Sequence, residues 1–267
     1  MRILCLNCWG GRIHPGLIAY LGGSEADVLC LQEIVHGPDA PEGWLDYRDG
    51  DTRLPQRARL YDEIAAALPG HRGAFSPAAR GPLWRGDQPF QTFWGLASFW
   101  RHDLVLTGMA QDFVHGAYNH DGYGPHPRAR TGLAMRLFEP ALGRHVTIGQ
   151  MHGLRDPASG KTDTPERAAQ AERFAALARG LAQPGDALVL CGDFNVEPDS
   201  MTLRHLARPG LTELVTAGGF PGTRNALYSK PGRHADYMLV DNATPVRHFD
   251  VVTSPEISDH CPLVLEI

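Results

Sequence analysis

Short apolar runs recur along the whole chain, and they predict β-strands. Many of these runs are apolar at nearly every position, which is typical of strands that are covered on both faces. They are Ile3–Leu6, Val28–Leu31, Leu96–Phe99, Leu133–Leu137, Val146–Met151, Ala187–Cys191, Tyr237–Val240, Phe249–Val252 and Pro262–Leu265.

Two segments between these runs have helical periodicity. Arg57–Leu68 repeats apolar residues at spacings of four and is followed by Pro-Gly, whereas Thr164–Leu181 begins with a capping threonine and a proline. Strands and helices interleave, and several links look like direct strand-to-strand returns. We therefore expect an α/β fold with mixed sheets. Because no internal repeat, low-complexity tract or linker is present, we expect one domain over residues 1–267.

Three long stretches carry no regular pattern and are predicted to be loops. They are Val35–Gln56, Ser76–Thr92 and Ala110–Arg130. Loops of this length inside a compact protein are usually functional. All three are rich in His, Arg, Trp, Asp and Gly, a composition that suits binding of a polar ligand.

Composition and charge limit the class of protein. The 267 residues are 43% hydrophobic, enough for a large core, and 25 Lys and Arg against 30 Asp and Glu give a net charge of −5. This charge argues against a strongly DNA-bound nuclease but does not exclude a nucleic-acid substrate. No apolar stretch approaches the roughly 20 residues of a membrane span, and a strand-like run begins almost at Met1. We expect a soluble, cytoplasmic protein whose oligomeric state the sequence leaves open.

The five cysteines are an odd number, and four lie in or beside apolar runs, which favours buried free thiols. Cys5 and Cys8 form a C-x-x-C pair, but no second pair stands elsewhere to complete a zinc site. In an extended strand an offset of three points two side chains to opposite faces. We expect a structural role for this pair.

Polar side chains stand at the ends of six apolar strands. Four strands run into a polar group at their carboxyl ends, and two begin just after an acidic residue or an Asp-His pair. If the last two strands run antiparallel to the others, all of these groups lie on one rim of the sheets. The groups in question are Asn7, Glu33, His152, Asp193 with Asn195, Asp236, and Asp259 with His260.

This set of residues suits phosphoryl chemistry. Glu33 and Asp259, with the Asn7 amide, are hard oxygen ligands of the kind that hold Mg²⁺ or Mn²⁺. A divalent ion offsets phosphate charge and can activate a water. His152 and His260 can handle protons or bind phosphate near neutral pH. Such an imidazole needs an acidic partner to fix its tautomer and favour its charged form, and Asp236 is the candidate partner of His260.

The motifs Leu-Gln-Glu, Gly-Asp-Phe-Asn and Ser-Asp-His, together with Asn7, His152 and Ala-Asp-Tyr, resemble those of the endonuclease/exonuclease/phosphatase superfamily, which includes deoxyribonuclease I. They follow the family order from residue 7 to residue 262. Gly-Asp-Phe-Asn followed by Ser-Asp-His is the specific part of the signal. The resemblance implies a four-layer α/β/β/α sandwich of two mixed β-sheets flanked by helices, with the active site on one rim.

The resemblance also implies a role for each residue. Glu33, Asn7 and Asp259 would hold the metal, and Asp193 would orient or deprotonate the attacking water. Asn195 and His152 would bind the scissile phosphate. Asp236 would pair with His260, which would contact the phosphate or act in proton transfer. The expected activity is hydrolysis of a small or lipid-type phosphate ester by a phosphodiesterase or phosphatase.

Departures from the family leave the substrate open. Ile34-Val35 follows Glu33 where abasic-site endonucleases have Thr-Lys, and the Trp-Cys-Asp-Arg segment of the inositol phosphatases is absent. The segments 161–167 and 224–228 look like marks of an uncharacterised bacterial branch. The alternatives are a DNA or RNA nuclease, and a protein that keeps the fold without activity.

Several further residues have two interpretations. Arg130, at the start of a predicted strand, would contact phosphate or only solvate the strand. His115, His120 and His126 match no rigid zinc template, so a substrate-recognition loop is favoured over a metal site. Three tryptophans could stack on a base or sugar, although hydrophobic anchoring is the commoner role; they are Trp84, Trp94 and Trp100.

Overall fold

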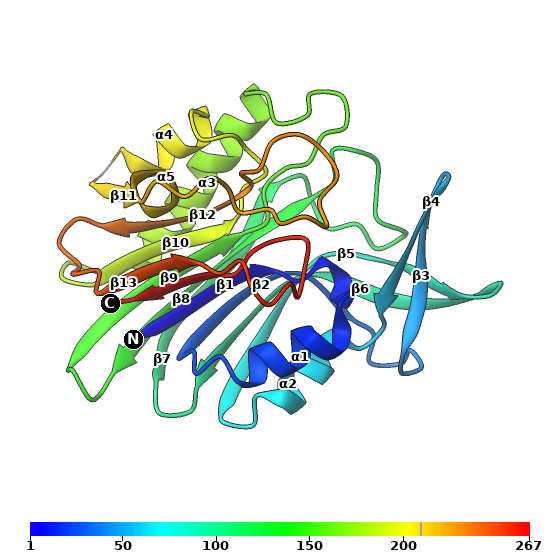
Figure 1. Ribbon diagram of the computed structural model, residues 1–267, viewed down its shortest axis with the longest axis horizontal. Coiled ribbons are helices and arrows are strands. Elements are labelled where there is room, and N and C mark those ends of the chain that lie inside the picture. Colours follow the sequence, from blue (N-terminus) through cyan, green and yellow to red (C-terminus); the bar gives the residue numbers. More distant parts are fainter. Residues whose placement is uncertain (209) are drawn as a thin grey trace.

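The computed structural model describes residues 1–208 and 210–267 and contains two β-sheets (Figure 1). The strands of the first sheet are β1 (Arg2–Asn7), β2 (Val28–His36), β3 (Trp44–Asp49), β4 (Thr52–Arg57), β5 (His71–Arg85), β6 (Gln88–Arg101), β13 (His248–Val251) and β14 (Leu263–Glu266). Those of the second are β7 (Val105–His115), β8 (Arg130–Glu139), β9 (Arg144–Met151), β10 (Ala187–Asp193), β11 (Leu211–Glu213) and β12 (Asp236–Asp241).

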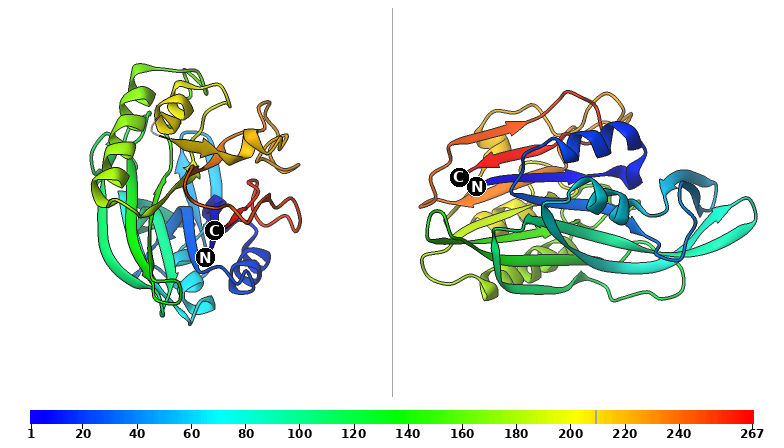
Figure 2. Two further views of the ribbon diagram at one scale, coloured as in Figure 1. Left: turned by 90° about the vertical axis from the view of Figure 1, so that its left-hand side faces the viewer. Right: turned by 90° about the horizontal axis from the view of Figure 1, so that it is seen from below.

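Helices cover the outer face of each sheet (Figures 1 and 2). On the first sheet these are α1 (His14–Gly22) and α2 (Leu60–Ala67), and on the second α3 (Pro165–Leu181), α4 (Met201–Ala207) and α5 (Leu214–Ala217). The strand order is β13-β14-β1-β2-β6-β5-β3-β4 in one sheet and β11-β12-β10-β9-β8-β7 in the other. This arrangement confirms the predicted α/β sandwich of two mixed sheets.

Strand β1 shows why apolar runs without alternation form the centre of this fold. Ile3 and Cys5 are buried in the core that includes the second sheet, whereas Leu4 and Leu6 are buried in the core beneath α1 and α2. All four side chains are at most 1% exposed. A strand covered on both faces has no position at which a polar residue would meet water.

Each sheet contains one parallel pair of strands, and these pairs aim their carboxyl ends at the same rim. The parallel pairs are β1 with β2 and β9 with β10. Strands β14 and β12 run antiparallel to β1 and β10, as the sequence interpretation requires. Asp193 at the end of β10 lies opposite Asp236 at the start of β12. The four strand ends and two strand starts therefore meet at one edge.

A chain of buried amides links the two sheets next to this edge. Gln32 Nε2 donates to Gln150 Oε1 at 2.8 Å, and Gln150 Nε2 donates to the Ala97 carbonyl at 2.8 Å and to Ser98 Oγ at 2.7 Å. Both glutamines are at most 1% exposed. Because buried polar groups are costly unless paired, this bridge fixes the register of one sheet against the other.

The predicted loops are only partly loops. Residues 44–57 form the hairpin β3–β4, residues 71–101 form the long hairpin β5–β6, and β7 extends to His115. The far parts of both hairpins project beyond the sandwich (Figure 1). The sequence pattern of these strands is weak because only a few apolar residues, such as Leu45, Tyr47 and Leu83, are buried on the arms, and they stand among Pro, Arg and Asp. Only residues 116–129 of the third stretch are irregular.

Helix boundaries follow the sequence more closely. The segment predicted from Thr164 forms α3, and the Thr164 side chain accepts a hydrogen bond from the Arg167 backbone N–H, as a capping residue should. The helix predicted over 57–68 begins at Leu60, because Arg57 still belongs to β4. Helix α1 was not predicted, since it is short and contains Pro15, Gly16 and Gly22.

The five cysteines are buried and free, as predicted. Cys5 lies in the core that includes the second sheet and Cys8 in the core beneath the helices, which confirms that the C-x-x-C pair points to opposite faces. Among the described residues, no helix has the length and apolar character needed to cross a membrane.

Two glycines allow the ends of β9 and β10 to approach each other at the rim. A Cβ atom on Gly192 would lie 2.0 Å from the Met151 carbonyl oxygen, and one on Gly153 would lie 2.2 Å from the Phe194 carbonyl oxygen. The Gly153 N–H donates to the Asp193 carbonyl at 2.6 Å. Any larger residue would separate two backbones, and Asp193 and His152 would move with them.

We predict that Gly153→Ala lowers the free energy of unfolding by roughly 1–3 kcal/mol, because the new methyl group overlaps backbone that cannot move aside. Gly180→Ala is the matched control, since a Cβ there meets no atom within 4 Å in helix α3. It is expected to raise stability by about 0.5–1 kcal/mol. Urea denaturation of both variants measures the difference, and equal stabilities would contradict the predicted overlap.

Candidate active site

The polar strand ends line one cleft of about 630 Å³. Seven of the residues singled out from the sequence lie in its wall: Glu33, Arg130, His152, Asp193, Asn195, Asp259 and His260. Two more, Asn7 and Asp236, are buried next to it and bonded to residues of the wall. The structure therefore brings together all nine of the residues to which the sequence analysis gave a site role.

Asp193 stands at the centre of this group. Its Oδ2 accepts a hydrogen bond from Asn7 Nδ2 at 2.9 Å and lies 3.7 Å from His152 Nε2 and 3.6 Å from His260 Nε2. Its Oδ1 accepts from the backbone N–H of Asn195 at 3.0 Å. The side chain is 2% exposed. Donors on several sides hold one carboxylate in a fixed orientation at the floor of the cleft.

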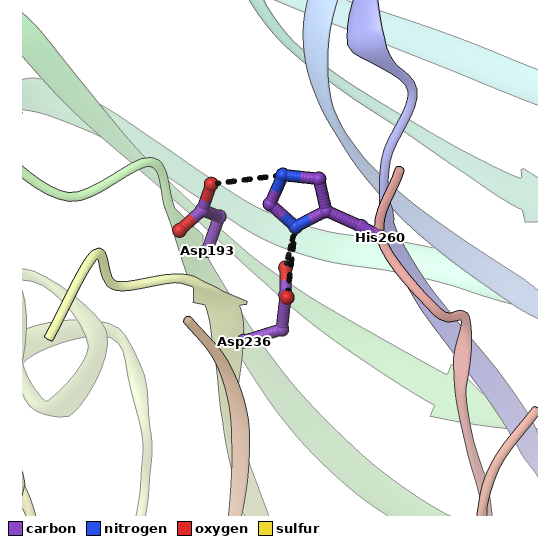
Figure 3. A group of neighbouring side chains, drawn as sticks. All are labelled: Asp193, Asp236 and His260. Carbon is purple, nitrogen blue, oxygen red and sulfur yellow. Dashed lines mark hydrogen bonds and ion pairs between the residues drawn. The ribbon is translucent and has the colours of Figure 1, made fainter. Parts of the chain in front are cut away.

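His260 and Asp236 form a buried pair (Figure 3). His260 Nδ1 lies 2.9 and 2.8 Å from the two carboxylate oxygens of Asp236. Thr223 Oγ1 donates to Asp236 Oδ2 at 2.8 Å and holds the carboxylate from the other side. The contact with Asp236 fixes the proton of His260 on Nδ1. Nε2 of His260 is then directed toward Asp193.

Burial governs the protonation of this pair. It raises the pKa of Asp236 to about 7 and lowers the pKa of His260 to about 4, because both charged forms lose their hydration. The imidazole is therefore neutral at neutral pH, and Nε2 is its ring nitrogen that is not bonded to Asp236. This corrects the expectation that Asp236 favours the charged form of His260, since loss of hydration outweighs the attraction of the carboxylate.

Glu33 owes its position to an irregularity in β2. The register between β2 and β6 shifts between Leu31 and Ile34, and Glu33 adopts φ +55°. Bulges of this kind redirect a side chain. Burial, followed by the nearby charge of Asp259, raises the pKa of the Glu33 carboxyl group. The bulge thus places an acidic side chain in the cleft that a regular strand would aim elsewhere.

Asn195 also lies in the left-handed region, with φ +53°. Its Nδ2 donates to the Gly153 carbonyl at 3.3 Å, which links the loop after β10 to the loop after β9. The two polar positions of the Gly-Asp-Phe-Asn motif are therefore held by different contacts. The buried Phe194 between them packs against Phe174 and Tyr237.

His152 and Arg130 form one wall of the cleft around Trp94. The ring of Trp94 lies 5.4 Å from that of His152, and the Arg130 guanidinium lies 5.0 Å from the Trp94 ring centroid. Arg130 Nε donates to the Gly153 carbonyl at 2.9 Å. Burial, followed by the charge of Arg130, lowers the pKa of His152 well below its usual value, so that this imidazole is neutral. Arg130 is thus a buried cation of the cleft.

The oxygen ligands proposed for a divalent ion fit such an ion. Asp259 Oδ1 is buried and has no hydrogen-bond partner among the described residues, and Glu33 and Asp259 are close enough for the charge of one to raise the pKa of the other. Asn7 Oδ1 accepts one hydrogen bond, from the Trp9 N–H, and keeps a second lone pair. A cation would relieve the repulsion between the two carboxylates and satisfy the orphaned oxygen.

A second group has metal-ligand spacing but is better explained otherwise. One ligand atom from each of Asp193, Asp236 and His260 lies within 4.8 Å of the others. However, His260 Nδ1 and the Asp236 carboxylate are already bonded to each other, and this bond accounts for their proximity. The oxygens of Asn7, Glu33 and Asp259 include a buried carboxylate oxygen, Asp259 Oδ1, that has no hydrogen-bond partner among the described residues.

Arg224 is one of the cleft residues to which the sequence analysis gave no role. Its Nη1 donates to Asp259 Oδ2 at 2.7 Å, its Nη2 lies 3.8 Å from Asp193 Oδ2, and it packs on the Tyr228 ring at 4.3 Å. Its Nε is buried without a partner among the described residues. The segment 224–228 was noted only as distinctive, because an arginine in an irregular stretch gives no sign of where it points.

The remaining candidates divide between the cleft and other places. His126 lines the cleft, whereas His120 lines a separate cavity with Arg80, so the loop histidines do not share one metal site in the described chain. Trp94 lines the cleft, as described above. Trp100 is buried in the core, and Trp84 lies on the β5–β6 hairpin under Arg48.

The chain is similar to several solved structures. A Bacteroides vulgatus endonuclease/exonuclease/phosphatase aligns with a TM-score of 0.68 at 14% identity, covering 99% of this chain and 97% of the other. A Bacteroides thetaiotaomicron mannosyl-6-phosphatase aligns at 0.67 and 17%, covering 100% and 98%. The human Nocturnin catalytic domain with bound sulfate aligns at 0.65 and 20%, covering 99% and 92%. A comparison with curated protein sequences gave no match.

One family model covers nearly the whole chain. The model described as "Endonuclease/Exonuclease/phosphatase family" matches residues 4–260, which extends from β1 to His260 of the buried pair. Members of this family hydrolyse phosphate esters and generally depend on a divalent metal, in line with the acidic and histidine side chains of the cleft. The protein therefore belongs to the endonuclease/exonuclease/phosphatase family and is a hydrolase of phosphate esters.

Proposed function

We propose that the protein hydrolyses a small phosphate ester, either a diester or a monoester, by in-line attack of water on phosphorus with the help of Mg²⁺ or Mn²⁺. The observation that carries this proposal is the position of the Asp193 carboxylate, which faces two neutral imidazoles inside a cleft lined with arginines. A base, proton acceptors and anion-binding groups in one cleft are what phosphoryl transfer to water requires.

Asp193 is the proposed residue that orients and deprotonates the attacking water. Its Oδ2 faces the cleft, and the Asn7 amide and the Asn195 N–H fix the carboxylate plane. His260 presents Nε2 at 3.6 Å from this oxygen, so that it can receive or return a proton next to the reacting water. Asp236 keeps the imidazole in the required tautomer and acts through His260, not on the substrate.

The scissile phosphate is proposed to bind between Asn195, His152 and Arg130. The Asn195 amide and the neutral His152 ring can donate hydrogen bonds to phosphate oxygens, and the buried Arg130 guanidinium supplies positive charge. Positioned donors of this kind stabilise the charge that develops on the phosphoryl oxygens.

Asn7, Glu33 and Asp259 are the proposed ligands of the divalent ion. When bound, the ion neutralises phosphate charge and lowers the pKa of a water molecule. These residues hold three oxygens at the carboxyl end of β1, at the bulge within β2 and just before β14. Arg224 pairs with the second oxygen of Asp259 and keeps this carboxylate turned toward the cleft.

A small ester is favoured over a nucleic acid because the chain as a whole is acidic, with a net charge of −5. The similar structures include a mannosyl-6-phosphatase, whose name describes action on a phosphorylated sugar. They also include a Nocturnin domain that holds a sulfate anion. The alternative is a DNA or RNA nuclease with the same metal ligands, which would cleave plasmid DNA.

Replacing Asp193 is expected to stop catalysis without unfolding the protein. Asp193→Asn should reduce hydrolysis of bis(p-nitrophenyl) phosphate or p-nitrophenyl phosphate at least about 100-fold, because the amide cannot accept the proton of water. The control is Asp199→Asn, since Asp199 is an exposed residue outside the cleft. Full activity of Asp193→Asn would refute the assigned role.

Metal removal is expected to abolish activity, and added Mg²⁺ or Mn²⁺ to restore it. Glu33→Gln and Asp259→Asn should each weaken Mn²⁺ binding at least about tenfold, because each removes one charged ligand. The electron paramagnetic resonance signal of free Mn²⁺ measures binding directly. The same affinity in both variants and the wild-type protein would place the ion elsewhere.

The nuclease alternative predicts nicking of plasmid DNA in the presence of Mg²⁺ or Mn²⁺. We expect supercoiled plasmid to remain intact under conditions in which the aryl phosphate is cleaved, because a chain with a net charge of −5 has no overall positive field to hold a duplex. Nicking that disappears in Asp193→Asn would instead assign the protein to the nucleases.

A further inference from the structure

Positive charge is concentrated in the cleft although the whole chain is acidic. Six Arg and Lys side chains line the cleft against four carboxylates: Arg12, Arg128, Arg130, Arg155, Arg224 and Lys230. Three of the four carboxylates are the site residues Glu33, Asp193 and Asp259, and the fourth, Asp49, is 2.7 Å from Arg128. The excess of positive charge therefore lies outside the group that holds the metal and the water.

Aromatic rings of the cleft hold guanidinium groups in place. Arg12 lies 4.0 Å from the centroid of the Trp9 ring, and Arg128 lies 5.4 and 5.6 Å from the rings of Tyr47 and Tyr123. The rings of Trp94 and Tyr228 are covered in the same way, as described above. A ring face covered by a guanidinium is not free to stack on a base, so these rings orient cations.

Four of the six cations of the cleft, Arg130 among them, have no carboxylate partner among the described residues. Arg130 is already proposed to bind the scissile phosphate. The other three are Arg12, Arg155 and Lys230, none of which forms an ion pair within 4 Å in residues 1–208 and 210–267. Arg155 stands in the loop between β9 and α3, three residues after His152, and its side chain is exposed. Arg155 lines the same cleft as His152 and Arg130, the residues of the proposed phosphate site.

From this arrangement we propose that the substrate is a small molecule with two phosphate groups, and that Arg155, with Arg12 and Lys230, binds the phosphate that is not cleaved. This inference rests on the proposed function, because it assumes that the first phosphate binds beside Asp193. A compact ligand is favoured over a nucleic-acid strand because the cleft is about 630 Å³ in volume and its rings are covered by arginines.

Alkane bisphosphonates test the proposal without turnover, since their carbon–phosphorus bonds are not phosphate esters. Isothermal titration calorimetry in Mg²⁺ would compare bisphosphonates of two to six methylene groups with monophosphonates of the same length. At the best length, the bisphosphonate is expected to bind at least about tenfold more tightly, the difference that one charge-assisted contact provides.

Two variants test which side chains bind the second phosphate. One is Arg155→Gln, and the other combines Arg12→Gln, Arg155→Gln and Lys230→Gln. Loss of the bisphosphonate advantage in either variant, with monophosphonate binding unchanged, supports the proposal. The matched control is Arg173→Gln, an exposed arginine of α3 outside the cleft, which should retain the full advantage.

Three results would overturn the proposal: equal binding of both ligand types at every length, an advantage that survives in the triple variant, or tighter binding of a single-stranded oligothymidylate than of any bisphosphonate. Because the phosphonates are not hydrolysed, these results are independent of whether the Asp193 prediction holds. A failure of the second phosphate subsite is thus distinguishable from a failure of the proposed hydrolysis.

Discussion

The direction of six strands is the constraint on which this active site depends. The parallel pairs β1–β2 and β9–β10 bring four carboxyl ends to one edge, and the antiparallel β12 and β14 begin at that same edge. No long loop is needed to bring distant residues together, because backbone hydrogen bonding already places Asp193 opposite Asp236. The amide bridge from Gln32 to Gln150 then holds the two sheets in one register. Local chemistry follows from these long-range pairings.

Burial gives the site its electrostatic character. Neutral His152 and His260, and the raised pKa values of Glu33 and Asp236, all reflect the loss of water around groups that would be charged in solution. Asp236 and His260 tolerate this environment because they are bonded to each other and Thr223 donates to Asp236. Asp259 Oδ1 and Arg224 Nε, by contrast, are buried without a partner in the described part of the chain, and both residues line the cleft.

Sequence reasoning found those parts of the site that coincide with the ends of buried strands. Asn7, Glu33, His152 and Asp193 follow apolar runs, and Asp236 and Asp259 precede them, so a simple pattern locates them. The pattern does not reveal Arg224, which lies in an irregular segment and is positioned by tertiary contacts alone. It also missed the β3–β4 and β5–β6 arms, since their few buried apolar residues stand among Pro, Arg and Asp and form no continuous apolar run. The bulge at Glu33 has no signature in residue type.

The left-handed backbone at Glu33 and Asn195 affects which substitutions would stabilise this protein. Each of these residues carries a conformational cost of roughly 1–2 kcal/mol that glycine would avoid. Random mutagenesis selected only for thermal resistance would therefore tend to replace both, and would remove an acidic and an amide group from the cleft. At these two positions we expect the residue that favours folding stability to differ from the residue that favours activity. Interactions elsewhere in the fold have to offset this conformational cost. Engineering for higher stability should therefore leave both positions unchanged.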